Sequence, residues 1–262
     1  MHLVLVPVYP GEHQSHQVKS LIHETTRDPR DLMTARTTTS RQQNTHLADG
    51  AVERLVKSRY RVKMHGEVFT PQSMVNRMLD LVRPELETGP RFVDKTFFEP
   101  AAGDGNFLIT ILHRKLKAIE KRYQPEFWHT ESLFALASIY GIELLEDNYE
   151  AAKAGMLTEF IAFHRHHGTS CGKQTNLWQA ATFLVDSNIQ RGNTLTALNP
   201  SGKKIEFSWW NRVLNDQGMV QREPFTFASL RNQHAGMFDF DVLSSYAQCC
   251  IDRVHQEART DV

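Results

Sequence analysis

The sequence predicts an α/β fold with a doubly wound, mostly parallel sheet. A short apolar strand at 97–98 runs into a Gly-x-Gly turn and then into an amphipathic helix. A second apolar strand at 139–144 leads into a long amphipathic helix, and a third, within 187–191, ends in a turn at Gly192. Strands that alternate with helices at this spacing are typical of parallel sheets, because each parallel connection needs a crossover segment.

The composition predicts a globular chain with one sizeable core. Of the 262 residues, 40% are hydrophobic and 23% are charged, which is enough apolar matter for such a core. Lys and Arg number 30, and so do Asp and Glu. With a net charge of zero, the whole chain is not drawn to nucleic acid or to a membrane, and a polyanion would need a local basic patch.

The first residues and the cysteines predict a cytoplasmic protein. The opening segment MHLVLVPVYP is apolar, but it lacks a basic region and is interrupted by Pro7 and Pro10. We therefore expect neither a secretory signal nor a membrane span. Three cysteines, two of them adjacent, make no disulfide framework, which suits a reducing compartment.

The chain divides near residue 60. Residues 1–60 are rich in Thr, Gln, His and Arg, and we expect an arm that is partly disordered or helical, with a helix near 50–58. Residues 61–262 are expected to form the α/β domain. At the junction, a solvated charged face is the commoner explanation of the basic run, and contact with phosphates is the alternative. This run interleaves Tyr60 with Lys57, Arg59, Arg61 and Lys63.

The following segment predicts a helix that begins after Thr70. Thr70 can cap the helix, and Pro71 suits its first turn. The helix is expected to end before Pro84. Its buried stripe is predicted to consist of Val75, Met78, Leu79 and Val82.

The strand at 97–98 ends in an acid and opens into a turn that indicates a ligand. Gly103 and Gly105 permit close backbone approach, and a helix starts directly after them. A nicotinamide dinucleotide fits poorly, because Leu108 replaces the third glycine of its motif and Glu99 would repel a pyrophosphate. Glu99 can instead accept hydrogen bonds from an ammonium group.

The second strand also ends in an acid, Glu143. An acid at this place characteristically accepts hydrogen bonds from both hydroxyls of a ribose. Either Glu99 or Glu143 alone is as often a solvated strand end. Together with the glycines, the two acids favour a nucleoside that carries an amino acid.

Four segments carry a family resemblance: GEVFTPQSMVNRML, FFEPAAGDGNFL, SIYGIELLEDNYEAAK and IQRGNTL. Their order and intervals over about 66–195 resemble those of S-adenosylmethionine-dependent DNA adenine N6-methyltransferases, particularly the modification subunits of restriction-modification systems. The resemblance implies a class I methyltransferase core of Rossmann-like topology, with S-adenosylmethionine as cofactor and DNA as partner. It also implies the specificity or restriction subunits of such a system as possible partners.

The resemblance further implies which residues surround the cofactor. Asn193 stands where the family usually has an acid that contacts the adenine amino group. The complete set implied by resemblance is Phe69, Thr70, Pro71, Glu99, Ala101, Gly103, Gly105, Ile142, Glu143, Leu144 and Asn193. Methyl transfer from a sulfonium centre requires in-line placement, which a rigid turn supplies, and no metal is expected.

The family's catalytic tetrapeptide, Asn or Asp followed by Pro, Pro and an aromatic residue, is absent. In MFDFDVLSSYAQ, which looks most like the strand before it, Ser244, Ser245 and Tyr246 occupy the expected place, so these three are the weak catalytic candidates. Asn199 and Pro200 are better explained by a loop turn. The chain ends soon afterwards, and we expect a sheet that is incomplete at its C-terminal end.

Three other patterns have structural explanations. HRHHGTSC, at 164–171, contains possible zinc ligands, but the polar end of a helix explains it. Cys249 and Cys250 are expected on a helix and buried. IEFSWW, at 205–210, is expected to be a strand with packed aromatic residues, and base stacking is its alternative.

Two functions therefore remain. The first is a site-specific DNA adenine methyltransferase of a restriction-modification system. The second is a non-catalytic module that binds S-adenosylmethionine and regulates or completes a partner subunit. The missing tetrapeptide separates them, because fold alone does not fix function.

Overall fold

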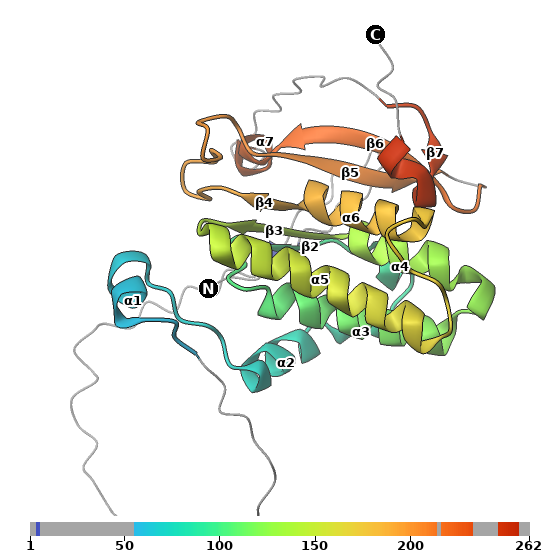
Figure 1. Ribbon diagram of the computed structural model, residues 1–262, viewed down its shortest axis with the longest axis horizontal. Coiled ribbons are helices and arrows are strands. Elements are labelled where there is room, and N and C mark those ends of the chain that lie inside the picture. Colours follow the sequence, from blue (N-terminus) through green and yellow to red (C-terminus); the bar gives the residue numbers. More distant parts are fainter. Residues whose placement is uncertain (1–3, 6–54, 214–215, 233–245, 257–262) are drawn as a thin grey trace, which may run out of the picture.

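A computed structural model describes residues 4–5, 55–213, 216–232 and 246–256. Its larger sheet has the order β1-β2-β3-β4. Figure 1 labels the three neighbouring strands β2, β3 and β4. The parallel strands β2 (Phe97–Glu99), β3 (Ile139–Glu143) and β4 (Ile189–Arg191) confirm the three predicted strands. The two-residue strand β1 (Val4–Leu5) pairs antiparallel with β2.

Helices connect the parallel strands, as the alternating pattern predicted. The connection from β2 to β3 contains α3 (Asn106–Arg122), the 3-10 turn η4 (Pro125–Phe127) and α4 (Trp128–Ala137). The connection from β3 to β4 contains α5 (Glu146–His166) and α6 (Asn176–Asn188). The last of these begins where the Thr175 hydroxyl accepts a 3.2 Å hydrogen bond from the Trp178 amide, a typical N-terminal cap.

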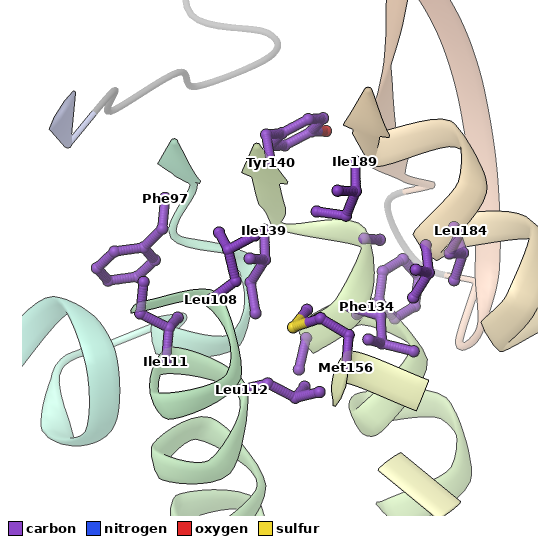
Figure 2. Packing of buried hydrophobic residues seen from close by; sticks show 14 of the residues in the cluster. Phe97, Leu108, Ile111, Leu112, Phe134, Ile139, Tyr140, Met156, Leu184 and Ile189 are labelled. Atoms are coloured by element: carbon purple, nitrogen blue, oxygen red, sulfur yellow. The ribbon is translucent and has the colours of Figure 1, made fainter. Parts of the chain in front are cut away.

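The core lies between these helices and one face of the sheet. Figure 2 shows Leu108 and Ile111 of α3, Phe134 of α4, Met156 of α5 and Leu184 of α6 on the same side of the strands. Tyr140 points to the opposite side. Because side chains alternate along a strand, β3 presents Ile139 to the helices and Tyr140 to the other face.

An antiparallel sheet of β5 (Glu206–Arg212), β6 (Met219–Thr226) and β7 (Cys249–Cys250) packs on that other face through aromatic rings. The ring of Phe207 lies 6.1 Å from Phe98 and 5.7 Å from Tyr140 between centroids. The Tyr140 hydroxyl donates a 2.8 Å hydrogen bond to the Ser208 carbonyl. The prediction that IEFSWW forms a strand with packed aromatic residues is confirmed. The remaining elements are α7 (Phe227–Asn232) and η6 (Ile251–Gln256).

The described part therefore shows an α/β fold with a parallel sheet, but it does not show the doubly wound arrangement that we predicted. After β4 the chain turns at Asn193 and forms the β5–β6 hairpin instead of another crossover helix. The aromatic side chains of this hairpin cover the face that a second helix layer would occupy. The prediction that Cys249 and Cys250 lie on a helix and are buried was wrong, because they form β7 and Cys250 is exposed.

Two helix boundaries near residue 70 also differ from the predictions. The helix α2 (Gln72–Asp80) begins one residue later than expected, with Pro71 at its N-terminal cap and no side-chain capping bond. Of the helix predicted near 50–58, residues 50–54 lie outside the described residues and 55–58 are not helical. A helix follows at α1 (Arg59–His65), capped by the Ser58 hydroxyl. A π-helical turn, η2 (Pro84–Thr88), and a 3-10 turn, η3 (Phe92–Asp94), then lead to β2.

Most of the predicted arm, residues 1–60, lies outside the described residues. Within the described part of the chain, no helix is both long enough and apolar enough to cross a membrane.

Candidate functional site

The carboxyl ends of β2 and β3 bring two buried acids to the same edge of the sheet. Glu99 is the last residue of β2 and pairs in register with Gly141, two residues before Glu143 at the end of β3. The exposed fraction is 1% for Glu99 and 7% for Glu143. Ligands of open α/β sheets bind outside the carboxyl ends of the strands, so this edge is the natural place for a site.

Glu143 is bound to the turn that follows β2. Its Oε2 accepts a 2.7 Å hydrogen bond from the Gly103 amide, and its Oε1 accepts a 2.9 Å bond from the Leu145 amide. Asn148 Nδ2 approaches the same Oε1 at 3.5 Å. A carboxylate has about four acceptor positions, so Glu143 retains capacity for a further donor at Oε2.

Glu99 has an acceptor atom that no described group satisfies. Its Oε1 accepts a 3.3 Å hydrogen bond from the Ala101 amide, whereas its buried Oε2 has no partner among the described residues. Burial raises the pKa of Glu99 to about 7, and the bond from Ala101 opposes this only in part. A buried carboxyl oxygen without a donor is costly, and an ammonium group would provide the missing donor and charge.

The turn between these acids requires its two glycines. Gly103 and Gly105 have φ values of 58° and 98°, a region that side chains disfavour. A Cβ atom on Gly103 would lie 3.3 Å from the Phe69 ring, and one on Gly105 would lie 2.9 Å from Ala152 Cα. Gly105 thus permits close packing of α3 against α5, in addition to the ligand approach that we expected of both glycines.

Asp104, between the two glycines, is a further candidate at this edge that the sequence analysis did not name. Its Oδ1 is buried without a partner among the described residues, and burial raises its pKa. The signal was present in the motif, because an acid inside a Gly-x-Gly turn must lie near whatever the turn holds. Glu99 at the end of β2 and Asp104 in the turn thus each have a carboxyl oxygen without a partner among the described residues, which favours a cationic over an anionic ligand group.

The segment Phe69, Thr70 and Pro71 lies beside this turn. Phe69 and Thr70 are buried, and the ring of Phe69 packs along Gly103. Asn106 Nδ2, in the first turn of α3, donates a 3.2 Å hydrogen bond to the Thr70 carbonyl. The structure thus fixes this segment against the start of α3.

The other residues that the resemblance implied differ in whether they are exposed at the edge. Ala101 and Leu144 are exposed near the edge, whereas Ile142 is fully buried in the core cluster and not exposed at the edge. The Asn193 side-chain oxygen accepts hydrogen bonds from the amides of Leu195 and Thr196, at 2.9 and 3.3 Å. That oxygen therefore closes the turn after β4.

The structure does not bring Tyr246 to this edge. Tyr246 is buried, and the Arg222 guanidinium lies 4.3 Å from its ring centroid. Arg222 pairs across β5–β6 with Trp210, whose indole donates a 2.9 Å hydrogen bond to Asn188, directly before β4 begins. Tyr246 therefore lies toward the amino ends of the parallel strands, and Ser244 and Ser245 lie outside the described residues.

A polar cluster at the start of α5, which sequence reasoning did not anticipate, links α1 to Glu143. Asn148 Nδ2 donates a 2.6 Å hydrogen bond to Glu67, and Arg61 binds Glu67 through two nitrogens, each at 2.5 Å. Arg61 and Lys57 each contact Asp147 at 2.8 Å. These two cations hold the pKa of Asp147 well below its usual range.

The histidine segment at the end of α5 has a structural role. His164 is buried, and its Nε2 lies 2.9 Å from the Ser132 hydroxyl of α4. Burial, together with the neighbouring His129 and His167, lowers the pKa of His164 to about 3. Among the described residues, no group of three or more His, Cys, Asp or Glu side chains is placed to hold a metal ion.

The part of the chain that carries this edge is similar to a known family of domains. Residues 83–201 match the family model described as MmeI, DNA-methyltransferase domain. The matched segment includes the strands and turns that carry Glu99, Gly103 and Glu143. The match therefore supports a methyltransferase core of the DNA-modifying class. Neither the comparison with curated proteins nor that with solved structures gives a match.

Proposed function

We propose that this chain binds S-adenosylmethionine at the carboxyl edge of β2 and β3 and acts in DNA adenine N6-methylation within a restriction-modification system. The observation that carries the proposal is the pair of buried acids, Glu99 and Glu143, joined through the Gly103 turn. The match of residues 83–201 to a DNA-methyltransferase domain supports the same class of activity.

The residues of the edge suit the two ends of this cofactor. The partnerless Oε2 of Glu99 fits an ammonium group, and Asp104 adds negative charge to the same turn. Glu143, held by the amides of Gly103 and Leu145, can accept a further hydrogen bond at Oε2 from a ribose hydroxyl. When bound, S-adenosylmethionine would supply an activated methyl group, and the chain's own residues would bind and orient it.

The buried acids also argue against a dinucleotide at this edge. A pyrophosphate would lie against the carboxyl groups of Glu99 and Asp104, and like charges at short range in a buried site are strongly unfavourable. The raised pKa of both groups already reflects their burial. A ligand that presents a positive group relieves this cost, and a ligand that presents an anion increases it.

A second function is favoured by the position of Tyr246. If the aromatic residue expected to stack on a flipped base is instead buried against Arg222, the chain lacks that contact. The second proposal is therefore a cofactor-binding module without turnover of its own, which regulates or completes a partner subunit.

One experiment tests both functions. The full chain is incubated with unmethylated duplex DNA and methyl-labelled S-adenosylmethionine, with and without the restriction subunits of its host, and the DNA is analysed for N6-methyladenine. Labelled adenine with the chain alone supports the first function. Cofactor binding with methylation only in the presence of a partner supports the second. Binding to neither cofactor nor DNA contradicts both.

A further inference from the structure

The helix α1 lies near the carboxyl ends of β2 and β3, which carry Glu99 and Glu143, and ion pairs attach it there. Lys57, two residues before α1, contacts Asp147 and Asn148 of α5, and Arg61 of α1 contacts Asp147. Arg61 also binds Glu67, just after the helix. None of the residues of α1 is buried. Asn148 also approaches Glu143, and Lys57 Nζ lies 5.7 Å from the centroid of Phe69, the ring that packs along Gly103. Only a few side chains therefore separate α1 from the turn.

These contacts divide the basic residues at 57–63 into an inner pair and an outer pair, here called the inner and outer stripes. Lys57 and Arg61, four residues apart, point to the body and are neutralised by Asp147 and Glu67. Arg59 and Lys63, also four residues apart, are exposed and make no ion pair with the described residues. The two carboxylates thus neutralise only two of the four basic side chains, and the remaining positive charge lies on Arg59 and Lys63.

The outer stripe also carries exposed apolar surface. Tyr60 is 68% exposed and Met64 is 56% exposed, and both lie beside Arg59 and Lys63 on consecutive turns of the helix. Cations interleaved with an exposed aromatic ring are suited to a polyanion that also offers stacking faces, which is the chemistry of a nucleic acid. A neutral protein partner would not use the charge.

We infer that the outer face of α1 contacts the DNA backbone beside the carboxyl edge of β2 and β3. This face is formed by Arg59, Tyr60, Lys63 and Met64. The inference rests on the proposed function, since it takes DNA as the substrate. In it, Lys57 and Arg61 position the helix, and Arg59 and Lys63 neutralise phosphates. The ion pairs at Asp147 and Glu67 prevent these acids from repelling the duplex.

The test is DNA affinity, measured by fluorescence anisotropy with a short labelled duplex over a series of salt concentrations. The double variant Arg59→Gln/Lys63→Gln should bind the duplex roughly tenfold or more weakly at low salt, and its salt slope should fall by about 2, as expected for two lost phosphate contacts. The matched control is Lys117→Gln/Lys121→Gln, an exposed pair with the same spacing near the far end of α3; its affinity should stay within about twofold of the parent.

Cofactor affinity is measured in parallel by calorimetry, so that the two proposals can fail separately. Both double variants should bind S-adenosylmethionine as the parent does, because Arg59 and Lys63 do not touch Glu99 or Glu143. If the Arg59→Gln/Lys63→Gln variant binds DNA as tightly as the parent, the inference is overturned and the proposed function is not affected. A parent that binds cofactor but no duplex also overturns it, while the cofactor site stands. A parent that does not bind cofactor overturns the proposed function.

Discussion

The Gly103 amide donates a 2.7 Å hydrogen bond to Glu143 Oε2, which joins the turn after β2 to the end of β3. This one hydrogen bond connects the two strand ends that form the candidate site. It holds the carboxylate at the end of one strand and the backbone of the neighbouring turn in a fixed relation. Its loss should therefore affect both ligand affinity and local stability.

The first prediction concerns Glu143. Replacing Glu143 by Ala should weaken S-adenosylmethionine binding by about 10- to 150-fold, because hydrogen bonds to a charged acceptor contribute roughly 1.5–3 kcal/mol. The amides of Gly103 and Leu145 also lose their acceptor, so the free energy of unfolding should fall. Titration calorimetry and urea unfolding measure the two effects. Glu150→Ala, an exposed glutamate on α5, is the control, and equal cofactor affinity in both variants would contradict the assignment.

The second prediction concerns Gly105. Gly105→Ala should lower the free energy of unfolding by more than about 2 kcal/mol, because its Cβ would meet the backbone of Ala152 at 2.9 Å in addition to the strain of a positive φ. Gly168→Ala is the matched control, since Gly168 has a φ of 72° but nothing within 4 Å of the added Cβ. Its cost should be about 1 kcal/mol. Equal destabilisation in the two variants would show that α3 and α5 do not pack closely at Gly105.

The third prediction is a proton linkage at Glu99. Because the folded-state pKa is raised to about 7, the folded chain holds a proton that an unfolded carboxyl releases near its ordinary pKa. The free energy of unfolding should therefore fall as pH rises toward 7. An ammonium ligand favours the carboxylate, so binding below about pH 7 should release a proton, and affinity should increase with pH up to that point.

Calorimetry at about pH 6 in buffers of different ionisation enthalpy measures this proton release. Glu99→Gln should bind more weakly and release less proton than the parent, whereas Glu150→Gln should release the same amount as the parent. Unchanged proton release in the Glu99→Gln variant would show that another group is responsible.

The fourth prediction concerns His164. Its pKa is lowered to about 3 in the folded chain because the ring is buried near His129 and His167. As pH falls below the ordinary histidine pKa of about 6.5, the unfolded chain takes up a proton that the folded chain excludes, so stability is full above that pH and decreases below it. His164→Gln should flatten this dependence, and the exposed control His166→Gln should not. Denaturant unfolding at several pH values checks this, and parallel slopes in all three chains would contradict the prediction.

The strand ends and the turn could be predicted from the sequence because their signals are local. The acid, the two glycines and the helical spacing that follows them all lie within about twenty residues of each other, and parallel strands bring their carboxyl ends to one edge. The structure accordingly places Glu99, Gly103 and Glu143 together. The segment at Phe69 could be placed beside them only through the family resemblance.

The rest depends on long-range contacts that no local pattern reveals. The described part of the chain does not show the doubly wound arrangement, because the aromatic hairpin β5–β6 covers the second face of the sheet there, and alternating strands do not show which sheet they join. Tyr246 looked like a site residue from its place in the sequence, but its ring lies against Arg222. The cluster of Lys57, Arg61 and Asp147 joins residues about ninety positions apart, so the division of the basic run into inner and outer stripes could not be foreseen.

The most direct test of the account is calorimetric titration of S-adenosylmethionine into the full chain and into the double variant Glu99→Gln/Glu143→Gln. The account predicts saturable binding of one cofactor per parent chain, loss of detectable binding in the double variant, and full retention in Glu150→Gln. A circular dichroism melt confirms that each chain is folded. No binding by the folded parent, or equal binding by the double variant, would contradict the claim that the two acids at the ends of β2 and β3 hold the cofactor.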